Sequence, residues 1–371
     1  MKLRVGVVGC GPMGAGHVKH YKGLPGCELV AVSDLDPARR AEAALKSGAM
    51  AFADPRELVG RVDAVSIATP TVSHRELAVM FLEAGIHVLV EKPMAPSVAD
   101  AQAMIDASRA RGVTLQVGHI ERFNPAFIAA KKVVSDPRYV ITDRLSPFAF
   151  RSMDIGVVLD LMIHDLDIVL EFLPGEIASI EAVGVPVLSS SEDMCDARLR
   201  FEDGALADLR ASRVSMKRMR KIRMFQRNAY LSIDYGQNSI TTFKKSDAYV
   251  SGELDPMSIR LQDLEDPFGF VFGQLLDVHE ASLDSSDALR DELSSFLRAC
   301  RGEHPPEVPG EHGLRAVRLA ERIQRECKTY IQKEADRAGI DLAAAIRPPR
   351  RATERLSESD GRTERYSPIE E

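Results

Sequence analysis

The sequence predicts an α/β protein with two domains, a doubly wound parallel sheet followed by an α+β domain built on an antiparallel sheet. Over residues 1–122, apolar strand-like runs alternate with amphipathic helical stretches, which is typical of a parallel sheet flanked by helices. Over residues 123–334, strand-like runs follow one another between helices, which indicates an antiparallel sheet. The length of 371 residues also favours two domains over one large core.

Composition and charge exclude several classes of function. The net charge of −7 argues against general nucleic-acid binding. No apolar run approaches the roughly 18–20 residues of a membrane span, and the chain begins with a strand-like run, so we expect neither a membrane contact nor a cleavable signal. The five cysteines are scattered and form no C-x-x-C pair, which is typical of reduced thiols in a cytoplasmic protein.

The first predicted strand, residues 3–8, leads directly into the glycine motif Gly9-x-Gly11-x-x-Gly14. The first glycine permits a tight turn, the second lets the backbone approach a pyrophosphate, and the third lets helix and strand pack closely. The helix that follows offers free N–H groups to the anion. Cys10 inside this loop is interpreted as a small packing residue rather than a reactive thiol.

The second predicted strand, residues 28–33, ends on Asp34, about 20 residues beyond Gly14. A carboxylate at this distance accepts hydrogen bonds from an adenosine ribose, favours the free 2′-hydroxyl of NAD and repels the 2′-phosphate of NADP. Arg39 and Arg40 lie close enough in sequence to keep NADP as an alternative cofactor. The other interpretation is that both arginines only begin a solvated helix. We therefore expect a dinucleotide site that binds NAD in preference to NADP.

Further strands are predicted at residues 63–68, 86–90 and 113–118, with a helix from Ser97, whose capping pattern includes Asp100, to Gly112. The strand at 86–90 is followed by Glu91-Lys92-Pro93 at its carboxyl end, where a doubly wound sheet presents its reactive groups. A lysine there donates to a substrate hydroxyl and stabilises a developing alkoxide. The alternative is an ordinary loop, because the tripeptide is common.

The second domain is predicted from its own series of elements. Helices are expected at 125–135, 157–173, 286–301 and 313–334, and strands at 138–145, 193–201, 205–211, 219–226, 229–235 and 239–244. The strands at 193–201 and 205–211 flank an Asp-Gly turn, which is a hairpin signal. The tail at 346–371 has little to bury and is expected to be disordered.

The helix at 157–173 is apolar almost all round, yet it carries a narrow polar stripe. The stripe consists of Asp160, His164, Asp167 and Glu171, while Asp165 points elsewhere, toward the sheet. Because Asp160 and His164 are one turn apart, the carboxylate is expected to bond the imidazole and raise its basicity, which suits a general base. The alternative is a structural Asp–His pair that ties two elements together.

Together these motifs resemble the glucose-fructose oxidoreductase / inositol dehydrogenase / MocA (Gfo/Idh/MocA) family. The resemblance covers residues 1 to about 333 and rests on the glycine motif, Asp34, Ala68-Thr69-Pro70, Glu91-Lys92-Pro93 and Asp160-x-x-x-His164-Asp165. It implies a Rossmann domain and a second domain with a mostly antiparallel, open sheet that forms homodimer or homotetramer contacts. It also implies hydride transfer between a sugar or cyclitol carbon and the nicotinamide.

The resemblance also implies roles for single residues. His164 would take the hydroxyl proton, Lys92 would assist it electrostatically and Asp160 would orient His164. The residues expected to bind the cofactor are Gly9, Gly11, Pro12, Met13, Gly14, Asp34, Thr69, Pro70, His74, Glu91 and Lys92.

A narrower resemblance lies in Gly118-His119-Ile120-Glu121-Arg122-Phe123-Asn124-Pro125, which is similar to the branch of UDP-N-acetylglucosamine 3-dehydrogenases that supply amino sugars for lipid A. Arg122 and Asn124, with Asp160 and His164, would then contact substrate. The alternative for Asn124 is a helix N-cap before Pro125, with Arg122 as a neighbouring surface charge. His119 and Glu121 lack metal-ligand spacing, so we expect no metal.

A basic stretch follows later in the chain, comprising Arg213, Lys217, Arg218, Arg220, Lys221, Arg223 and Arg227. Some of these side chains could bind the diphosphate of a nucleotide sugar. The alternative is that these charges lie on a solvent-exposed face of a sheet or in a subunit contact.

The predicted function is that of an NAD-dependent dehydrogenase, one that oxidises a secondary hydroxyl of a UDP-linked amino sugar. A dehydrogenase of a free sugar or inositol, and a non-catalytic regulator that senses NAD, are the alternatives.

Overall fold

The computed structural model describes residues 2–149, 155–260, 262, 264–283 and 286–339. The chain divides into two units, residues 1–331 and 332–371, and the fold and site below belong to the first. The tail at 346–371, predicted to be disordered, lies outside the described residues. The domain boundary predicted between residues 122 and 123 stays a prediction.

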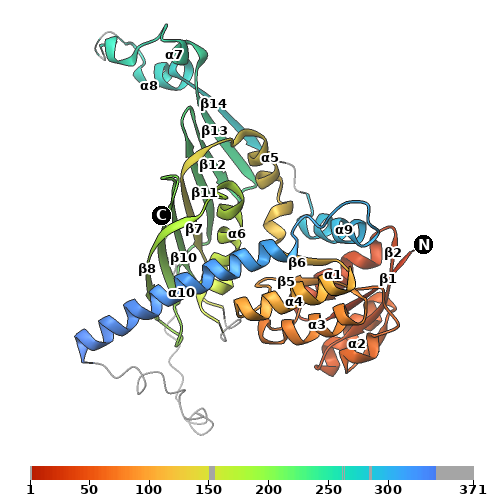
Figure 1. The fold of residues 1–371 in the computed structure, drawn as a ribbon. Coiled ribbons are helices and arrows are strands. Elements are labelled where there is room, and N and C mark those ends of the chain that lie inside the picture. The colour runs from red at the N-terminus through yellow and green to blue at the C-terminus, as the bar shows by residue number, and fades with distance from the viewer. Residues whose placement is uncertain (1, 150–154, 261, 263, 284–285, 340–371) are drawn as a thin grey trace, which may run out of the picture. The chain divides into compact units, whose positions relative to one another are not determined.

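The first sheet has six parallel strands in the order β3-β2-β1-β4-β5-β6. Its strands are β1 Leu3–Val8, β2 Cys27–Ser33, β3 Met50–Phe52, β4 Ala64–Ile67, β5 His87–Glu91 and β6 Leu115–Gly118. The helices are α1 Pro12–Gly23, α2 Pro37–Ser47, α3 His74–Glu83 and α4 Val98–Arg111 (Figure 1). The strand order reverses at β1 and β4, and such a switch point leaves a crevice at the carboxyl ends of the strands. The predicted parallel sheet is confirmed; only the three-residue β3 was not predicted.

Local signals set the helix ends in this sheet. Asp36 caps α2 by accepting from the amides of Ala38 and Arg39. Ser97 caps α4 by accepting from the amide of Asp100, and Gly112 ends that helix in the left-handed region. The capping pattern predicted for α4 is therefore confirmed.

The second sheet has eight strands in the order β14-β13-β12-β11-β7-β10-β9-β8, and all neighbours are antiparallel except β7 and β10. Its strands are β7 Pro137–Leu145, β8 Ile177–Val185, β9 Met194–Phe201, β10 Leu206–Ser212, β11 Met219–Gln226, β12 Ala229–Asp234, β13 Ser239–Lys245 and β14 Leu276–Ser282. The two edge strands, β8 and β14, were not predicted. Most of their side chains are exposed or half-buried, so their sequences lack the clear apolar alternation of a half-buried strand.

Helical elements cover one face of this sheet. They are α5 Pro125–Val133, the π-helical turn η4 Val158–Met162 and α6 Ile163–Phe172, where a single helix was predicted. Residues of α6 such as Leu166 and Val169 pack with Leu209 and Ile222 of the sheet in one buried core. Two further helices, α7 Asp247–Ser251 and α8 Pro267–Phe270, lie between β13 and β14 beyond the ends of these strands (Figure 1).

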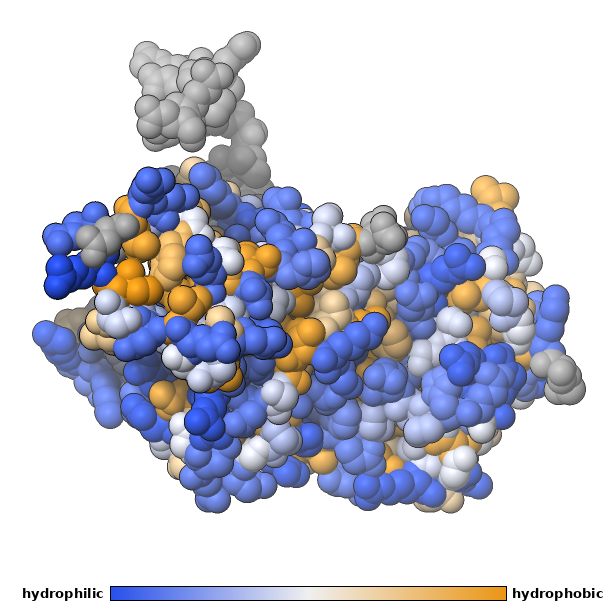
Figure 2. Space-filling model, turned by 90° about the horizontal axis from the view of Figure 1, so that it is seen from above, coloured by the Kyte–Doolittle hydropathy of each residue, from blue (hydrophilic) through white to orange (hydrophobic). Residues whose placement is uncertain are grey.

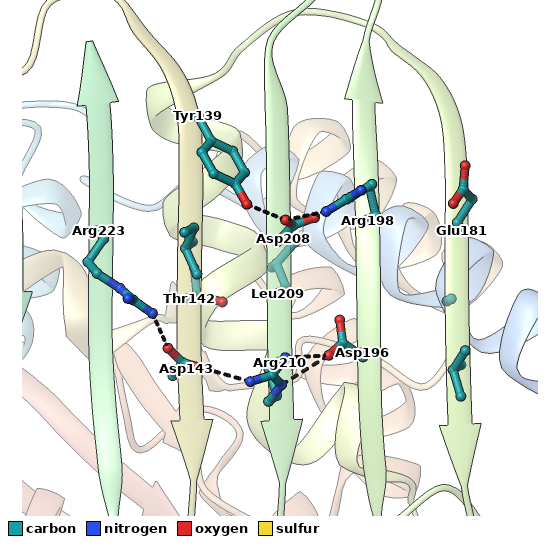
Figure 3. A pocket seen from close by; sticks show the side chains of 13 residues that line it. Tyr139, Thr142, Asp143, Glu181, Asp196, Arg198, Asp208, Leu209, Arg210 and Arg223 are labelled. Carbon is teal, nitrogen blue, oxygen red and sulfur yellow. Dashed lines mark hydrogen bonds and ion pairs between the residues drawn. The ribbon is translucent and has the colours of Figure 1, made fainter.

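The other face of the second sheet is polar and charged. Figure 3 shows Arg198 and Tyr139 converging on Asp208, and Arg210 lying between Asp143 and Asp196. These side chains line a shallow depression of about 480 Å³. No helix of the described chain crosses in front of these side chains in Figure 3, and we refer to this face of the sheet as the open face.

The chain returns to the first sheet after β14. The helix α9 Ala288–Cys300 contributes Phe296 and Leu297 to a core that also contains Val7 and Tyr21. The Val308 carbonyl then accepts from the Val117 amide of β6, and α10 runs over Gly310–Ala338. Most side chains on the face in Figure 2 are hydrophilic, and among the described helices none is long and apolar enough to cross a membrane.

Candidate active site

The glycine loop between β1 and α1 has the shape that a pyrophosphate requires. Gly9 has a φ of +88°, and a Cβ at Gly14 would lie 1.7 Å from the Gly9 carbonyl oxygen. No side chain caps the N-terminus of α1, whose N-cap is Gly11. The amides of this first turn therefore remain available to an anion, and the loop fits the dinucleotide that the motif predicts.

Asp34 is held in a fixed position at the end of β2. One carboxylate oxygen accepts from the Cys10 amide at 2.6 Å and the other from the Asp36 amide at 2.8 Å. Arg40 donates to the Asp34 carbonyl at 2.6 Å, and Arg39 lies 3.5 Å from the Asp36 carboxylate. Arg40 is thus held by the protein itself, whereas the exposed Arg39 side chain lines the cleft beside Asp34, so the preference for NAD rests on the Asp34 carboxylate.

A cleft of about 620 Å³ gathers most of the predicted cofactor residues. Of those residues it is lined by Gly9, Gly11, Pro12, Met13, Asp34, Thr69 and Pro70. Leu35 and Ser73 also line it, and no sequence motif indicated either residue. Burial raises the pKa of the Cys10 thiol to about 11, so this sulfur is a thiol at neutral pH, which agrees with its interpretation as a packing residue.

His74 and Glu91, both predicted cofactor ligands, lie just beyond this cleft. The His74 ring nitrogens face the carbonyl oxygens of Pro93 and Thr69 at 3.0 and 2.9 Å, so the imidazole connects these two loops. The Glu91 carboxylate pairs with the buried His17 at 2.9 Å. Contact of either residue with the cofactor stays a prediction.

The Lys92 side chain reaches from the end of β5 in the first sheet to the helical segment that covers the second sheet. Its amine donates to the Asp160 carbonyl at 2.8 Å and lies 3.8 Å from the Asp160 carboxylate. The Lys92–Pro93 peptide bond is cis. The structure therefore brings together Lys92 and Asp160, two of the three predicted catalytic side chains, from elements far apart in the sequence.

His164 lies four residues beyond Asp160, but the predicted hydrogen bond between them is wrong. In the described part of the chain, no partner reaches the buried Nδ1 of His164. The π-helical turn over Val158–Met162 explains the difference, because its wider turn shifts the register of a regular helix. The predicted rise in basicity is also wrong: burial, followed by the charges of Lys92 and Arg144, lowers the pKa of His164 well below its usual value.

The rest of the predicted stripe belongs to a buried ion-pair cluster. Arg122 donates to Asp167 at 2.5 and 2.9 Å and pairs with Glu171 at 2.7 Å. The Arg122 side chain is only 4% exposed, so its interpretation as a surface charge is wrong. Asn124 caps α5 by accepting from the Ala126 amide, as the alternative interpretation proposed. Substrate binding by Arg122 or Asn124 stays a prediction.

Sequence reasoning missed a second buried cluster beneath the same helix. Arg144 of β7 binds Asp165 through two hydrogen bonds of 2.8 Å and reaches Glu121 at 3.0 Å. This contact confirms that Asp165 points toward the sheet. An arginine at a core-facing position of a strand could have indicated a buried ion pair, although it does not identify the partner.

His119 is a buried histidine near the Arg122–Asp167 pair, whose charges act on its ring. It is 1% exposed, and neither ring nitrogen finds a partner among the described residues. Burial lowers its pKa, so the ring is neutral. The described residues contain no group of three or more His, Cys, Asp or Glu side chains arranged to hold a metal ion.

The fold and the site define a dinucleotide-dependent oxidoreductase. Residues 3–119 match the model of an oxidoreductase family with an NAD-binding Rossmann fold, and residues 135–230 match the C-terminal domain of the same family. The chain belongs to this Gfo/Idh/MocA family, and its cofactor is NAD.

Relatives and a solved structure match this chain over most of its length. The chain is 32% identical to the UDP-N-acetylglucosamine 3-dehydrogenase of Acidithiobacillus ferrooxidans over 89% of this chain and 99% of that protein. It is 28% identical to the myo-inositol 2-dehydrogenase of Thermotoga maritima over 85% and 94% of the two chains. A solved structure of the Acidithiobacillus enzyme superposes with a TM-score of 0.78 and covers 90% of this chain and 100% of its own.

Proposed function

We propose that this protein oxidises a secondary hydroxyl of a nucleotide-linked sugar, C3 of UDP-N-acetylglucosamine, to a keto sugar with hydride transfer to NAD. The observation that carries the proposal is the contact of the Lys92 amine with Asp160, in a setting where the Lys92 charge also acts on the His164 ring. The loop that follows Lys92 is tied through His74 to Thr69, which lines the dinucleotide cleft. The similarity to the Acidithiobacillus dehydrogenase supports the choice of substrate. The expected setting is cytoplasmic supply of amino sugars for lipid A.

Each residue of the candidate site has a separate role in the proposed reaction. NAD, bound through the glycine loop and Asp34, supplies the hydride acceptor. His164 is neutral at pH 7 because its pKa is lowered, so its ring can accept the hydroxyl proton. The Lys92 ammonium stabilises the developing alkoxide. Asp160 positions Lys92 through its carbonyl and carboxylate, in place of the predicted role of orienting His164.

The test is spectrophotometry at 340 nm with a panel of UDP-sugars and both NAD and NADP. Lys92→Ala should bind NAD nearly as the wild type does and lose turnover; full activity in this variant contradicts the role of Lys92. Turnover of myo-inositol alone supports the inositol dehydrogenase alternative, which the Thermotoga relative also favours. NAD binding without turnover of any substrate supports a regulator.

We also propose that the open face of the second sheet joins copies of this chain into a homodimer or homotetramer. Its acidic and basic side chains alternate, so the same surface on a second copy offers opposite charges (Figure 3). Such self-complementarity is what a two-fold contact requires. Light scattering of the wild type and of Arg210→Glu should give a larger mass for the wild type; equal masses contradict the proposal.

A further inference from the structure

The basic stretch between residues 213 and 227 contains one cation that differs from the others. Arg213, Lys221 and Arg223 form ion pairs with Asp193, Asp234 and Asp143 at 2.8, 3.1 and 2.7 Å. Lys217, Arg218 and Arg227 are exposed in the turns before and after β11. Arg220 lies within β11 itself, and no carboxylate pairs with it in the part of the chain that the structure describes.

The register of the sheet shows which face Arg220 occupies. Arg220 of β11 lies directly opposite Arg144 of β7, and residues directly opposite in an antiparallel pair project to the same face. Arg144 reaches Asp165 of α6, so Arg220 also lies on the face that α6 covers. Lys221 and Arg223, an odd number of residues away, project to the opposite face.

Arg220 stands at the rim of the candidate active site. It is exposed while Arg144 is buried, so the cover of the helices ends between these two side chains. Its charge acts on the His164 ring in the same direction as burial and as the charges of Lys92 and Arg144. Asp165 and Glu121 pair with Arg144 at 2.8 and 3.0 Å. Both carboxylates also act on the charge of Arg220, but among the described residues none forms an ion pair with it.

We infer that Arg220 binds a phosphate group of the substrate and thereby selects sugars that carry a nucleoside diphosphate. The inference rests on the proposed function and deepens it. A guanidinium donates two parallel hydrogen bonds to a phosphate, a geometry that a neutral polyol cannot accept with equal strength. A dehydrogenase of free inositol would have no phosphate for this guanidinium to bind.

The experiment compares Arg220→Met with Arg227→Met, a matched control in the turn just beyond the far end of the same strand. Arg227 is also an exposed arginine for which the described chain offers no carboxylate partner. Arg220→Met should raise the KM for the UDP-sugar about 10- to 100-fold and weaken UDP binding to the NAD complex equally. Arg227→Met should leave both constants unchanged, and Arg220→Lys should recover part of the loss. The Kd for NAD and the melting temperature should be equal in all variants.

The outcomes separate this inference from the proposed function. Wild-type turnover of a UDP-sugar with an unchanged KM in Arg220→Met overturns the role of Arg220 and leaves the proposed function intact. Arg220-dependent binding of UDP without turnover of any UDP-sugar supports the role of Arg220 and overturns the proposed function. A wild type that neither binds UDP nor oxidises a UDP-sugar overturns both.

Discussion

Glu292 on α9 should make the protein less stable as pH rises, and Glu292→Gln should remove that dependence. The Glu292 side chain is fully buried, and neither of its carboxylate oxygens has a partner among the described residues. Burial, and then the negative charge of Glu91, raise the pKa of Glu292 well above its usual value. The folded protein therefore keeps this carboxyl protonated at a pH at which the unfolded chain has already lost the proton.

The sign and size of this pH dependence follow from the linkage between proton binding and folding. A folded pKa above the unfolded one means that the full stability is present below the unfolded pKa, about 4.3 for glutamate, and is lost toward the folded pKa. Between the two values, each pH unit lowers the free energy of unfolding by about 1.4 kcal/mol. Glutamine has a similar shape and no proton to lose, so the difference between variant and wild type should grow by that amount per unit.

Urea titrations at pH 5, 6 and 7 measure the difference directly. Asp291→Asn is the matched control, because Asp291 is the preceding residue on α9 and is exposed. The free energy of unfolding of Asp291→Asn should differ from that of the wild type by a nearly constant amount over this range. The infrared band of a protonated carboxyl should also be weaker in Glu292→Gln. A difference between Glu292→Gln and the wild type that does not change with pH would refute a neutral, buried Glu292.

Three further predictions concern the site. Arg122→Met should lower the free energy of unfolding by about 3–5 kcal/mol, as urea titration would show, because Asp167 is then a buried charge without its guanidinium partner; a loss below 1 kcal/mol contradicts this. Asp34→Ser should raise the KM for NAD and narrow the preference over NADP in initial-rate assays, since the ribose loses its acceptor; an unchanged preference argues against the role of Asp34. In Lys92→Met the His164 pKa, measured by NMR titration, should be higher than in the wild type because a neighbouring cation is gone, and an equal or lower value contradicts their proximity.

The first domain could be predicted because its signals are local. The glycine loop, the Asp34 position and the cap of α4 each depend on residues within one strand–turn–helix unit, and each was found as expected. Lys92 was placed at a strand end by the same kind of reasoning. The Rossmann fold and its cofactor therefore followed from short stretches of sequence.

The contacts of the second domain could not be predicted in the same way, because they join distant segments. A regular helix was assumed over residues 157–173, and one π-helical turn was enough to remove the Asp160–His164 bond. The partner of Arg144 lies 21 residues away on another element, and no pattern within either segment indicates their pairing. The core-facing side chains of the edge strands β8 and β14 are mostly only half-buried, so their sequences show no clear apolar alternation.

The two arginine clusters hold α6, the helix that carries His164, the proposed base. Arg122 binds Asp167, and Arg144 binds Asp165 on a different side of the same helix. Bidentate hydrogen bonds from a guanidinium are directional. They therefore fix the rotation of a helix about its axis more closely than apolar packing does. Buried ion pairs contribute little net stability compared with apolar residues, so their value here lies in orientation. His164 directly precedes Asp165, so its backbone is held in place by contacts that it does not itself make.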